Sequence, residues 1–172
     1  MELPELDGAT ILTTLQRHGV QFVLIGGMAA IVHGSPFPTE DVDLTPERSP
    51  DNLARLSDAL RELEAKVRAR GVVEALPFNH DAQSLGHVGV WNLVTPHGIL
   101  DISFVPTGTE GYPDLVRDSA ERTIFGVSVR VASLADVIRS KQAANRPKDQ
   151  RVLPTLRELL ARRLDDPRPG AG

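Results

Sequence analysis

A glycine pair followed by two closely spaced aspartates is the feature of this sequence that most constrains its fold. Residues 21–25 are typical of a buried strand, and Gly26 and Gly27 follow them directly, ahead of a helix-compatible segment. Thirteen residues separate Gly27 from Asp41, which shares an apolar segment with Asp43. Because strand side chains alternate between two faces, both carboxylates should point to the same side. The pattern predicts an α/β fold with two acids beside a glycine turn.

Such a turn and such acids are suited to binding a divalent cation and a nucleoside triphosphate. Carboxylate oxygens are preferred ligands of Mg²⁺, and Gly26 and Gly27 let the backbone approach a phosphate at the start of a helix. Nucleotide transfer needs cations that polarise the triphosphate and activate the attacking hydroxyl. We therefore expect Mg²⁺, as two ions, with an NTP as substrate, and we interpret the chain as a nucleotidyltransferase.

A third carboxylate is expected from a neighbouring strand that faces the same way. Asp101 interrupts the apolar segment 99–104. An acid at a half-buried strand position is unfavourable unless it is paired or binds a metal. We predict that Asp41, Asp43 and Asp101 are the metal ligands and the catalytic carboxylates. The alternative for Asp101 is an acid in a salt bridge at the edge of a strand.

Basic residues near the C-terminus are candidates for binding the triphosphate. Lys141 lies late in a predicted helix, and Arg146 follows in the next turn. Both can neutralise phosphate charge during transfer, so we predict Lys141 as a catalytic and nucleotide-binding residue and Arg146 as nucleotide-binding. Asp149 belongs to the same predicted group, either orienting one of these cations or capping the next helix. The alternative is an ordinary basic helix surface.

Charge is distributed unevenly along the chain. Residues 1–138 carry a net charge of -9, and residues 139–172 carry +5. Such an asymmetry can mark a surface for a polyanion, although a solvated Arg-rich helix gives the same pattern. The chain has no cysteine, which excludes disulfides and cysteine nucleophiles. No apolar segment approaches the ~20 residues that cross a bilayer, and the acidic N-terminus lacks a signal-peptide pattern, so we expect a cytoplasmic protein without membrane contact.

The remaining sequence predicts a small mixed β-sheet flanked by helices, with a helical C-terminal part. Helices are expected at 8–18, 27–33, 50–70, 110–118 and 133–145 and from 147 onward, and strands at 21–25, 41–44, 88–95, 99–105, 122–125 and 127–131. Pro154 should break or kink the last helix, with Thr155 starting its final turns. We expect one domain at 1–164, made of a catalytic core at 20–131 and a helical part at 133–164, and a flexible tail at 165–172.

At these motifs the chain resembles the nucleotidyltransferase superfamily with the polymerase-beta-like fold. The superfamily pattern is a hydrophobic residue, two small residues, a spacer and D-h-D-h, which here reads Ile25-Gly26-Gly27 and Asp41-Val42-Asp43-Leu44. Within that superfamily the chain resembles the AbiEii-type (MenT-like) toxins of bacterial toxin–antitoxin systems. This narrower resemblance rests on the segments GGMAAIVHGS at 26–35, SLADVIRSK at 133–141 and RPKD at 146–149.

The resemblance implies a Mg²⁺-dependent transfer of NMP from an NTP. In the better-understood relatives the acceptor is the 3′ end of tRNA, and the transfer blocks aminoacylation and stops growth. The resemblance makes Asp41, Asp43 and Asp101 the metal carboxylates, and Lys141 and Arg146 the triphosphate contacts. It also implies a cognate antitoxin protein as a partner.

Two residues in the loop before the aspartates bear on binding and regulation. Relatives often carry an arginine where this chain has Phe37, so the resemblance does not carry that phosphate contact over to this chain. Thr39 lies two residues before Asp41, and a phosphate on its hydroxyl would add about -1.5 to -2 charges beside the triphosphate. We predict Thr39 as a regulatory phosphorylation site, because some related toxins are neutralised by phosphorylation in this region. The alternative for Thr39 is a threonine that starts a strand.

Three other functions remain open at this point. A small-molecule nucleotidyltransferase of the aminoglycoside-modifying kind would need an acidic pocket, which the acid-rich N-terminal part can supply. Transfer of a nucleotide to a protein is a further possibility. A non-catalytic nucleotide-binding partner protein is the alternative outside enzymes, and the presence of the glycine pair, the acids and Lys141 argues against it.

Overall fold

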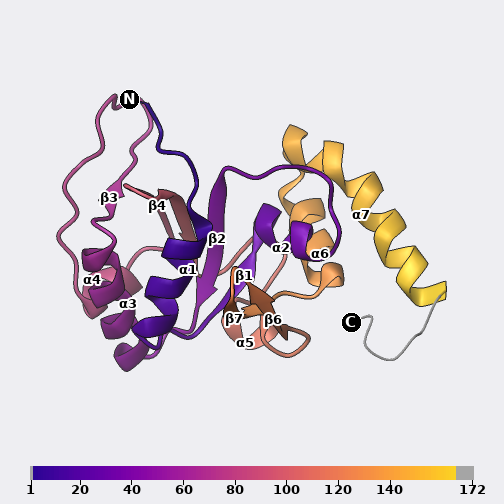
Figure 1. Ribbon diagram of the computed structural model, residues 1–172, viewed down its shortest axis with the longest axis horizontal. Helices are drawn as coiled ribbons and strands as arrows, with labels where there is room; N and C mark the ends of the chain where they lie inside the picture. The colour runs from indigo at the N-terminus through magenta and orange to yellow at the C-terminus, as the bar shows by residue number, and fades with distance from the viewer. Residues whose placement is uncertain (1, 166–172) are drawn as a thin grey trace.

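Among residues 2–165, which the computed structural model describes, seven strands form one mixed β-sheet in the order β3-β4-β5-β2-β1-β7-β6 (Figure 1). The strands are β1 (Phe22–Ile25), β2 (Asp41–Pro46), β3 (Lys66–Val67), β4 (Val90–Thr95), β5 (Gly98–Ser103), β6 (Ala120–Ile124) and β7 (Val127–Val131). β2 pairs in parallel with β5, and β1 with β7, while the other neighbours are antiparallel. The predicted α/β class with a mixed sheet is confirmed, and the two predicted hairpins are β4–β5 and β6–β7.

Helices lie on both sides of β2 in Figure 1. They are α1 (Gly8–Arg17), α2 (Gly26–Val32), α3 (Pro50–Glu62), α4 (Ala82–Gly86), α5 (Tyr112–Leu115), α6 (Leu134–Ala144) and α7 (Pro147–Asp165). α1, α3 and α4 gather on the left of the view, and α2, α6 and α7 lie on the right. α6 packs against both α2 and α7, so the C-terminal helices lie beside the glycine turn. In the described part of the chain no helix combines the length and apolarity that a membrane span requires.

The alternation of side chains along the central strands separates a core face from a polar face. Val42 and Leu44 of β2 and Leu100 and Ile102 of β5 have no exposed surface, and they share the core with Leu56 of α3. Burying an aliphatic side chain of this size contributes about 1.5–3 kcal/mol, which fixes the register of both strands. The acids that alternate with these residues therefore point to the opposite side of the sheet.

The helix predicted at 50–70 ends earlier, at Glu62. Glu64 takes a left-handed conformation (φ 52°), which reverses the chain, and the next residues form the edge strand β3 against β4. Leu63 and Val67 continue the apolar spacing of α3 because both still pack against the core. The periodicity therefore could not show where the helix stops, and pairing with β4 decides it.

Pro154 was expected to break or kink the last helix, and the structure shows no break there, because α7 runs without interruption from Pro147 to Asp165. Proline removes one backbone N–H from the helix. Leu153 and Leu156 on either side of it are buried in the core and hold the helix on its neighbours. Side-chain packing thus outweighs the lost hydrogen bond. Of the tail predicted at 165–172, residues 166–172 lie outside the described residues, and Asp165 is the last residue of α7.

α4 was not predicted. It begins at a capping box in which the Asp81 side chain accepts a hydrogen bond from the Ser84 backbone N–H, while the Ser84 hydroxyl lies 2.9 Å from the Asp81 backbone N–H and accepts from it. Asp81 and Ser84 stand at the spacing of a capping box, but Ser replaces the usual Glu or Gln. The helix has only five residues, too short to show an apolar period.

Candidate active site

Three carboxylates meet on the polar face of the sheet. The parallel pairing of β2 with β5 sets Asp43 directly opposite Asp101, and Asp41 lies two residues before Asp43 on the same face. One oxygen from each of the three lies within 4.8 Å of the others. All three side chains are half-buried, and in the described residues no other cluster of acids, His or Cys converges in this way. The strand register thus gathers the three acids predicted as a metal site.

The cluster is electrostatically unfavourable by itself. Burial, together with repulsion from Asp41 and Asp101, raises the pKa of Asp43 to about 7. Burial also raises the pKa of Asp101, although the Arg68 guanidinium opposes it. No hydrogen bond contributes to the pKa of Asp43. Oxygen donors that are close together, mutually repelling and short of hydrogen-bond donors fit a hard divalent cation such as Mg²⁺.

The glycine turn makes room for this cluster. Gly26 adopts φ 69°, and a Cβ at this position would lie 2.3 Å from Asp43 Oδ2. A Cβ on Gly27 would lie 2.9 Å from Thr39 Oγ1. The Thr39 hydroxyl in turn donates to Asp41 Oδ1 at 3.1 Å. The sequence predicts that these glycines let the backbone approach a phosphate. The structure gives a second reason for glycine at both positions, because a Cβ would collide with Asp43 or with Thr39.

Cationic side chains reach the same place from α6 and α7. Asn145 ends α6 in a left-handed conformation, and α7 begins two residues later. Asp149, which has no exposed surface, accepts hydrogen bonds from the Arg146 backbone N–H (3.1 Å) and Nε (2.7 Å). Its Oδ1 lies 3.7 Å from Lys141 Nζ. Asp149 therefore both orients two cations and caps α7, the two roles that the sequence left open.

The charge state of Asp149 follows from these contacts. Burial by itself raises the pKa of Asp149, but hydrogen bonds and charge from Arg146, with a smaller effect of Lys141, lower it overall. The carboxylate is ionised and enclosed by its two partners. With no exposed surface, Asp149 can contact a ligand of the cleft only through Arg146 and Lys141.

A cleft of about 770 Å³ joins the acids to the cations. This size is typical of a small-molecule site. The predicted residues that line it are Gly26, Gly27, Thr39, Asp41, Asp43, Asp101, Lys141 and Arg146. Phe37 also lines the cleft, and its side chain is exposed. The two regions that the sequence joined only by hypothesis, 26–43 and 141–149, therefore share one cavity.

Two residues near the acids were not predicted. Lys148 lines the cleft and lowers the pKa of Asp43 by its charge. Its position between Arg146 and Asp149 was the available signal, because it shares a short basic segment with them. Arg68 donates from Nη2 to Asp101 Oδ1 at 2.9 Å. No sequence signal indicated this contact, since residue 68 fell inside the overextended helix.

Comparison with known proteins identifies the fold. No protein-family model and no curated protein matches the sequence. A candidate nucleotidyltransferase from Thermotoga maritima aligns over 89% of each chain with a TM-score of 0.50 and 18% identity. The lincosamide antibiotic adenylyltransferase LnuA, with lincomycin bound, aligns over 91% of this chain and 99% of its own (TM-score 0.60, 14% identity). The antibiotic-resistance factor ANT(2'')-Ia aligns over 88% of this chain and 86% of its own (TM-score 0.52, 16% identity).

These likenesses establish a nucleotidyltransferase fold with a helical C-terminal part. At such identities they speak for the fold alone. The narrower resemblance to AbiEii-type toxins stays a prediction.

Proposed function

We propose that this protein transfers a nucleoside monophosphate from an NTP to the hydroxyl of an acceptor. One observation carries the proposal: in a nucleotidyltransferase fold, the carboxylates of Asp41, Asp43 and Asp101 face Lys141 and Arg146 across one cleft. Carboxylates bind the cation that accompanies a triphosphate, and the basic side chains bind the triphosphate itself.

The reaction is a displacement at the α-phosphorus. The acceptor oxygen forms a bond to this phosphorus while the bond to the bridging oxygen breaks, and pyrophosphate leaves with the electron pair. The hydroxyl proton passes to a carboxylate of the cluster. Lys141 and Arg146, held by Asp149, are placed to stabilise the charge that grows on pyrophosphate. Bound Mg²⁺, expected as two ions, would supply the positive charge that polarises the phosphate and activates the hydroxyl.

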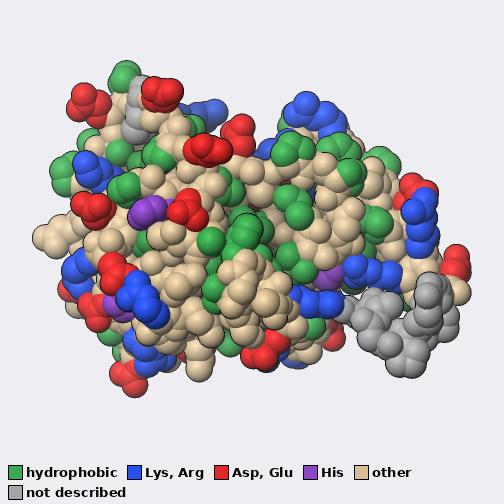
Figure 2. Space-filling view, viewed as in Figure 1, with side chains coloured by type: hydrophobic (Ala, Val, Ile, Leu, Met, Phe, Trp, Pro, Cys, Tyr) green, Lys and Arg blue, Asp and Glu red, His purple; other side chains and the backbone are tan. Residues whose placement is uncertain are grey.

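The proposed acceptor is the 3′ end of tRNA, which would make the protein the growth-inhibiting toxin of a toxin–antitoxin pair. The motif resemblance supports this choice, and so does α7. Lys148 and Arg151 lie three residues apart and are therefore neighbours on the surface of the helix. Within the described residues, neither side chain forms an ion pair. Figure 2 shows Lys and Arg side chains gathered over the end of α7 where the chain enters it. A basic track that starts in the cleft can follow an RNA backbone.

A small antibiotic-like molecule is the second candidate acceptor. Two of the structural neighbours are described as an antibiotic adenylyltransferase and an antibiotic-resistance factor. Phe37 and Val90, both partly exposed, line the cleft together with the acids. These apolar side chains suit the ring of a compact organic acceptor better than a phosphate backbone.

Labelled NTPs separate the two acceptors. Purified protein, Mg²⁺ and each α-³²P-NTP are incubated with total tRNA or with a panel of lincosamides and aminoglycosides, beside an Asp41→Ala variant. We expect label on tRNA, lost in the variant and strongly reduced by 200 mM salt, because RNA binding releases counterions. Label only on a small molecule would replace tRNA by the second acceptor. Label on neither, from any NTP, would contradict both proposed acceptors.

Regulation at Thr39 is part of the proposal. The hydroxyl already touches Asp41, and Gly27 packs against it. A phosphate there would add charge of the same sign as the acids and would occupy the path of the triphosphate. Thr39→Glu should therefore abolish transfer, whereas Thr39→Val should reduce it only modestly. Full activity in Thr39→Glu would count against the idea.

A further inference from the structure

Arg68 reaches one of the three acids from the far edge of the sheet. It follows the short strand β3, and its backbone N–H donates to Asn92 O at 2.9 Å. Its side chain crosses β4, where Nε donates to Leu93 O at 3.3 Å, and its Nη2 donates to Asp101 Oδ1 at 2.9 Å. The Arg68 side chain is 29% exposed and that of Asp101 21%. The guanidinium is thus fixed at two points, on the backbone of β4 and on the acid.

This contact determines how Asp101 presents itself to the cluster. In the described residues Arg68 is the one donor to the Asp101 carboxylate, and it takes Oδ1. Oδ2 is left free, and with Arg68 in place the three acids already converge within 4.8 Å. A carboxylate held through one oxygen has a fixed plane, so its second oxygen points in a defined direction. Without Arg68 the Asp101 side chain could rotate away from its two repelling neighbours.

We propose that Arg68 is a positioning residue, which holds Asp101 so that its free oxygen completes the divalent-cation site. The inference rests on the proposed function, because it requires that the three carboxylates hold a cation. It goes beyond that function by assigning a role to an arginine outside the cleft and outside every motif. Partners that orient a metal ligand typically change affinity or activity by ~10–100-fold when removed.

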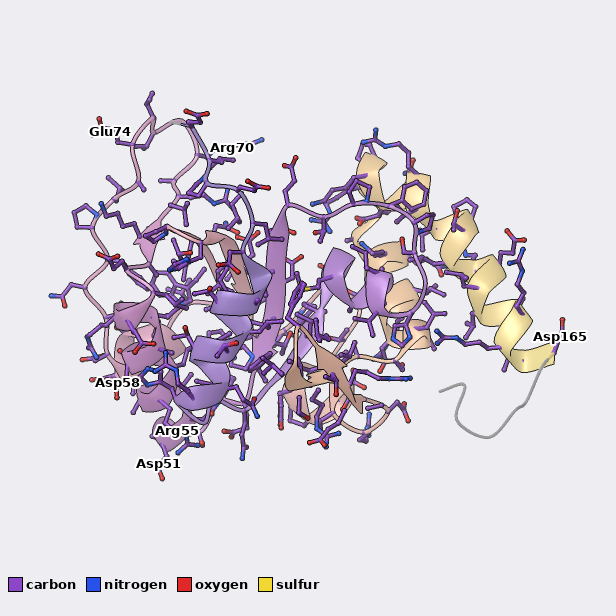
Figure 3. All side chains as sticks on the ribbon, viewed as in Figure 1. Asp51, Arg55, Asp58, Arg70, Glu74 and Asp165 are labelled. Carbon is purple, nitrogen blue, oxygen red and sulfur yellow. The ribbon has the colours of Figure 1, made fainter. Side chains whose placement is uncertain are left out.

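The competing explanation is a neutralising charge. On that account Arg68 merely offsets the acids until a cation displaces it, so its removal would tighten cation binding. The anchoring of Nε on the β4 backbone argues against displacement, because the guanidinium would have to break two contacts to leave. Arg70 provides a matched control: it carries the same charge two residues further on, and Figure 3 shows it on the outer loop.

The experiment measures Mn²⁺ binding by electron paramagnetic resonance, with no nucleotide present, so that catalysis does not enter. The proteins are wild type, Arg68→Ala, Arg68→Lys and the control Arg70→Ala. We expect the Mn²⁺ Kd to rise ~10-fold in Arg68→Ala and to stay unchanged in Arg70→Ala. Arg68→Lys keeps the charge but cannot make both contacts, so its Kd should resemble that of Arg68→Ala. In an Asp101→Asn background, Arg68→Ala should have no further effect.

The Mn²⁺ Kd values of these variants distinguish positioning by Arg68 from charge neutralisation. An Mn²⁺ Kd that is unchanged or lower in Arg68→Ala would overturn the proposal, and so would full restoration by lysine. Metal-free melting temperatures check the fold, and a partly exposed ion pair should move them by no more than ~4 °C. If Arg68→Ala does not fold, Arg68→Lys and Arg68→Gln carry the same test. A wild-type protein that binds no Mn²⁺ would instead overturn the proposed function itself.

Discussion

Asp43→Asn should stabilise the metal-free protein, although it removes a predicted metal ligand. The folded protein raises the pKa of Asp43 from 3.8 to about 7. Between these values the unfolded chain is ionised while the folded chain still holds the proton. Below about pH 4 Asp43 is protonated in both states, so its raised pKa does not lower the free energy of unfolding. As the pH rises towards 7 the free energy of unfolding falls, because the unfolded chain ionises and the folded chain does not. Asparagine cannot ionise, so the variant escapes this loss.

The size of the effect follows from the shift in the pKa. A change from 3.8 to about 7 corresponds to about 4 kcal/mol at pH 8, at 1.36 kcal/mol for each pH unit. The side chain keeps some contact with water, and the proton is shared within a cluster of acids, so we expect about half of this, ~2 kcal/mol. For a chain of this length that is a rise of ~4–8 °C in melting temperature.

Thermal melts in EDTA at pH 4.5 and pH 8 measure this effect. Asp43→Asn should exceed wild type clearly at pH 8 and by much less at pH 4.5, where only the unfolded chain has begun to ionise at Asp43. Glu74→Gln, an exposed acid on the outer loop (Figure 3), should show neither difference. A variant that is no more stable at pH 8, or equally shifted at both pH values, would refute the electrostatic reasoning.

Three further predictions address the site. Gly26→Ala places a Cβ 2.3 Å from Asp43 Oδ2, so nucleotidyl transfer and Mn²⁺ affinity should both fall by at least ~100-fold. The control is Gly71→Ala, where φ is also positive but no atom lies near the new Cβ, and it should lower the free energy of unfolding by only ~1 kcal/mol. Asp149→Asn loosens Arg146, so the KM for the NTP should rise ~10-fold in steady-state kinetics while the Mn²⁺ Kd stays the same; a changed Mn²⁺ Kd would contradict the division of roles. Because bound Mn²⁺ must displace the proton of Asp43, whose pKa is about 7, Mn²⁺ affinity should fall as pH drops below 7 and level off above it, and pH-independent binding in the titration would exclude Asp43 as a ligand.

Sequence periodicity was a good guide to the acids because it depends on local geometry. The two-residue repeat of a strand puts Asp41 and Asp43 on one face, and an acid in an apolar segment marks Asp101. That Asp101 stands directly opposite Asp43 is a matter of strand register, which hydrophobic burial of the alternate residues enforces. The mixed sheet and both hairpins could be predicted for the same reason.

Contacts between distant segments could not be predicted in this way. Arg68 fell inside a predicted helix, because the apolar spacing of α3 continues through Leu63 and Val67 after the helix has ended. Pro154 was expected to break or kink a helix that core packing continues without a break. Asp149 contacts both Arg146 and Lys141 because of the turn between α6 and α7. A single sequence does not show how close this turn brings the three side chains.

The most direct test of nucleotidyl transfer compares one NTP labelled at either end of its triphosphate. The protein is incubated with Mg²⁺ and a mixture of tRNA and small antibiotics, using α-³²P-NTP in one reaction and γ-³²P-NTP in the other. Nucleotidyl transfer predicts α-label on an acceptor and γ-label in pyrophosphate, with both lost in Asp41→Ala. Label from the γ-position on an acceptor would show phosphoryl transfer, and it would contradict the roles assigned to the acids and cations of the cleft.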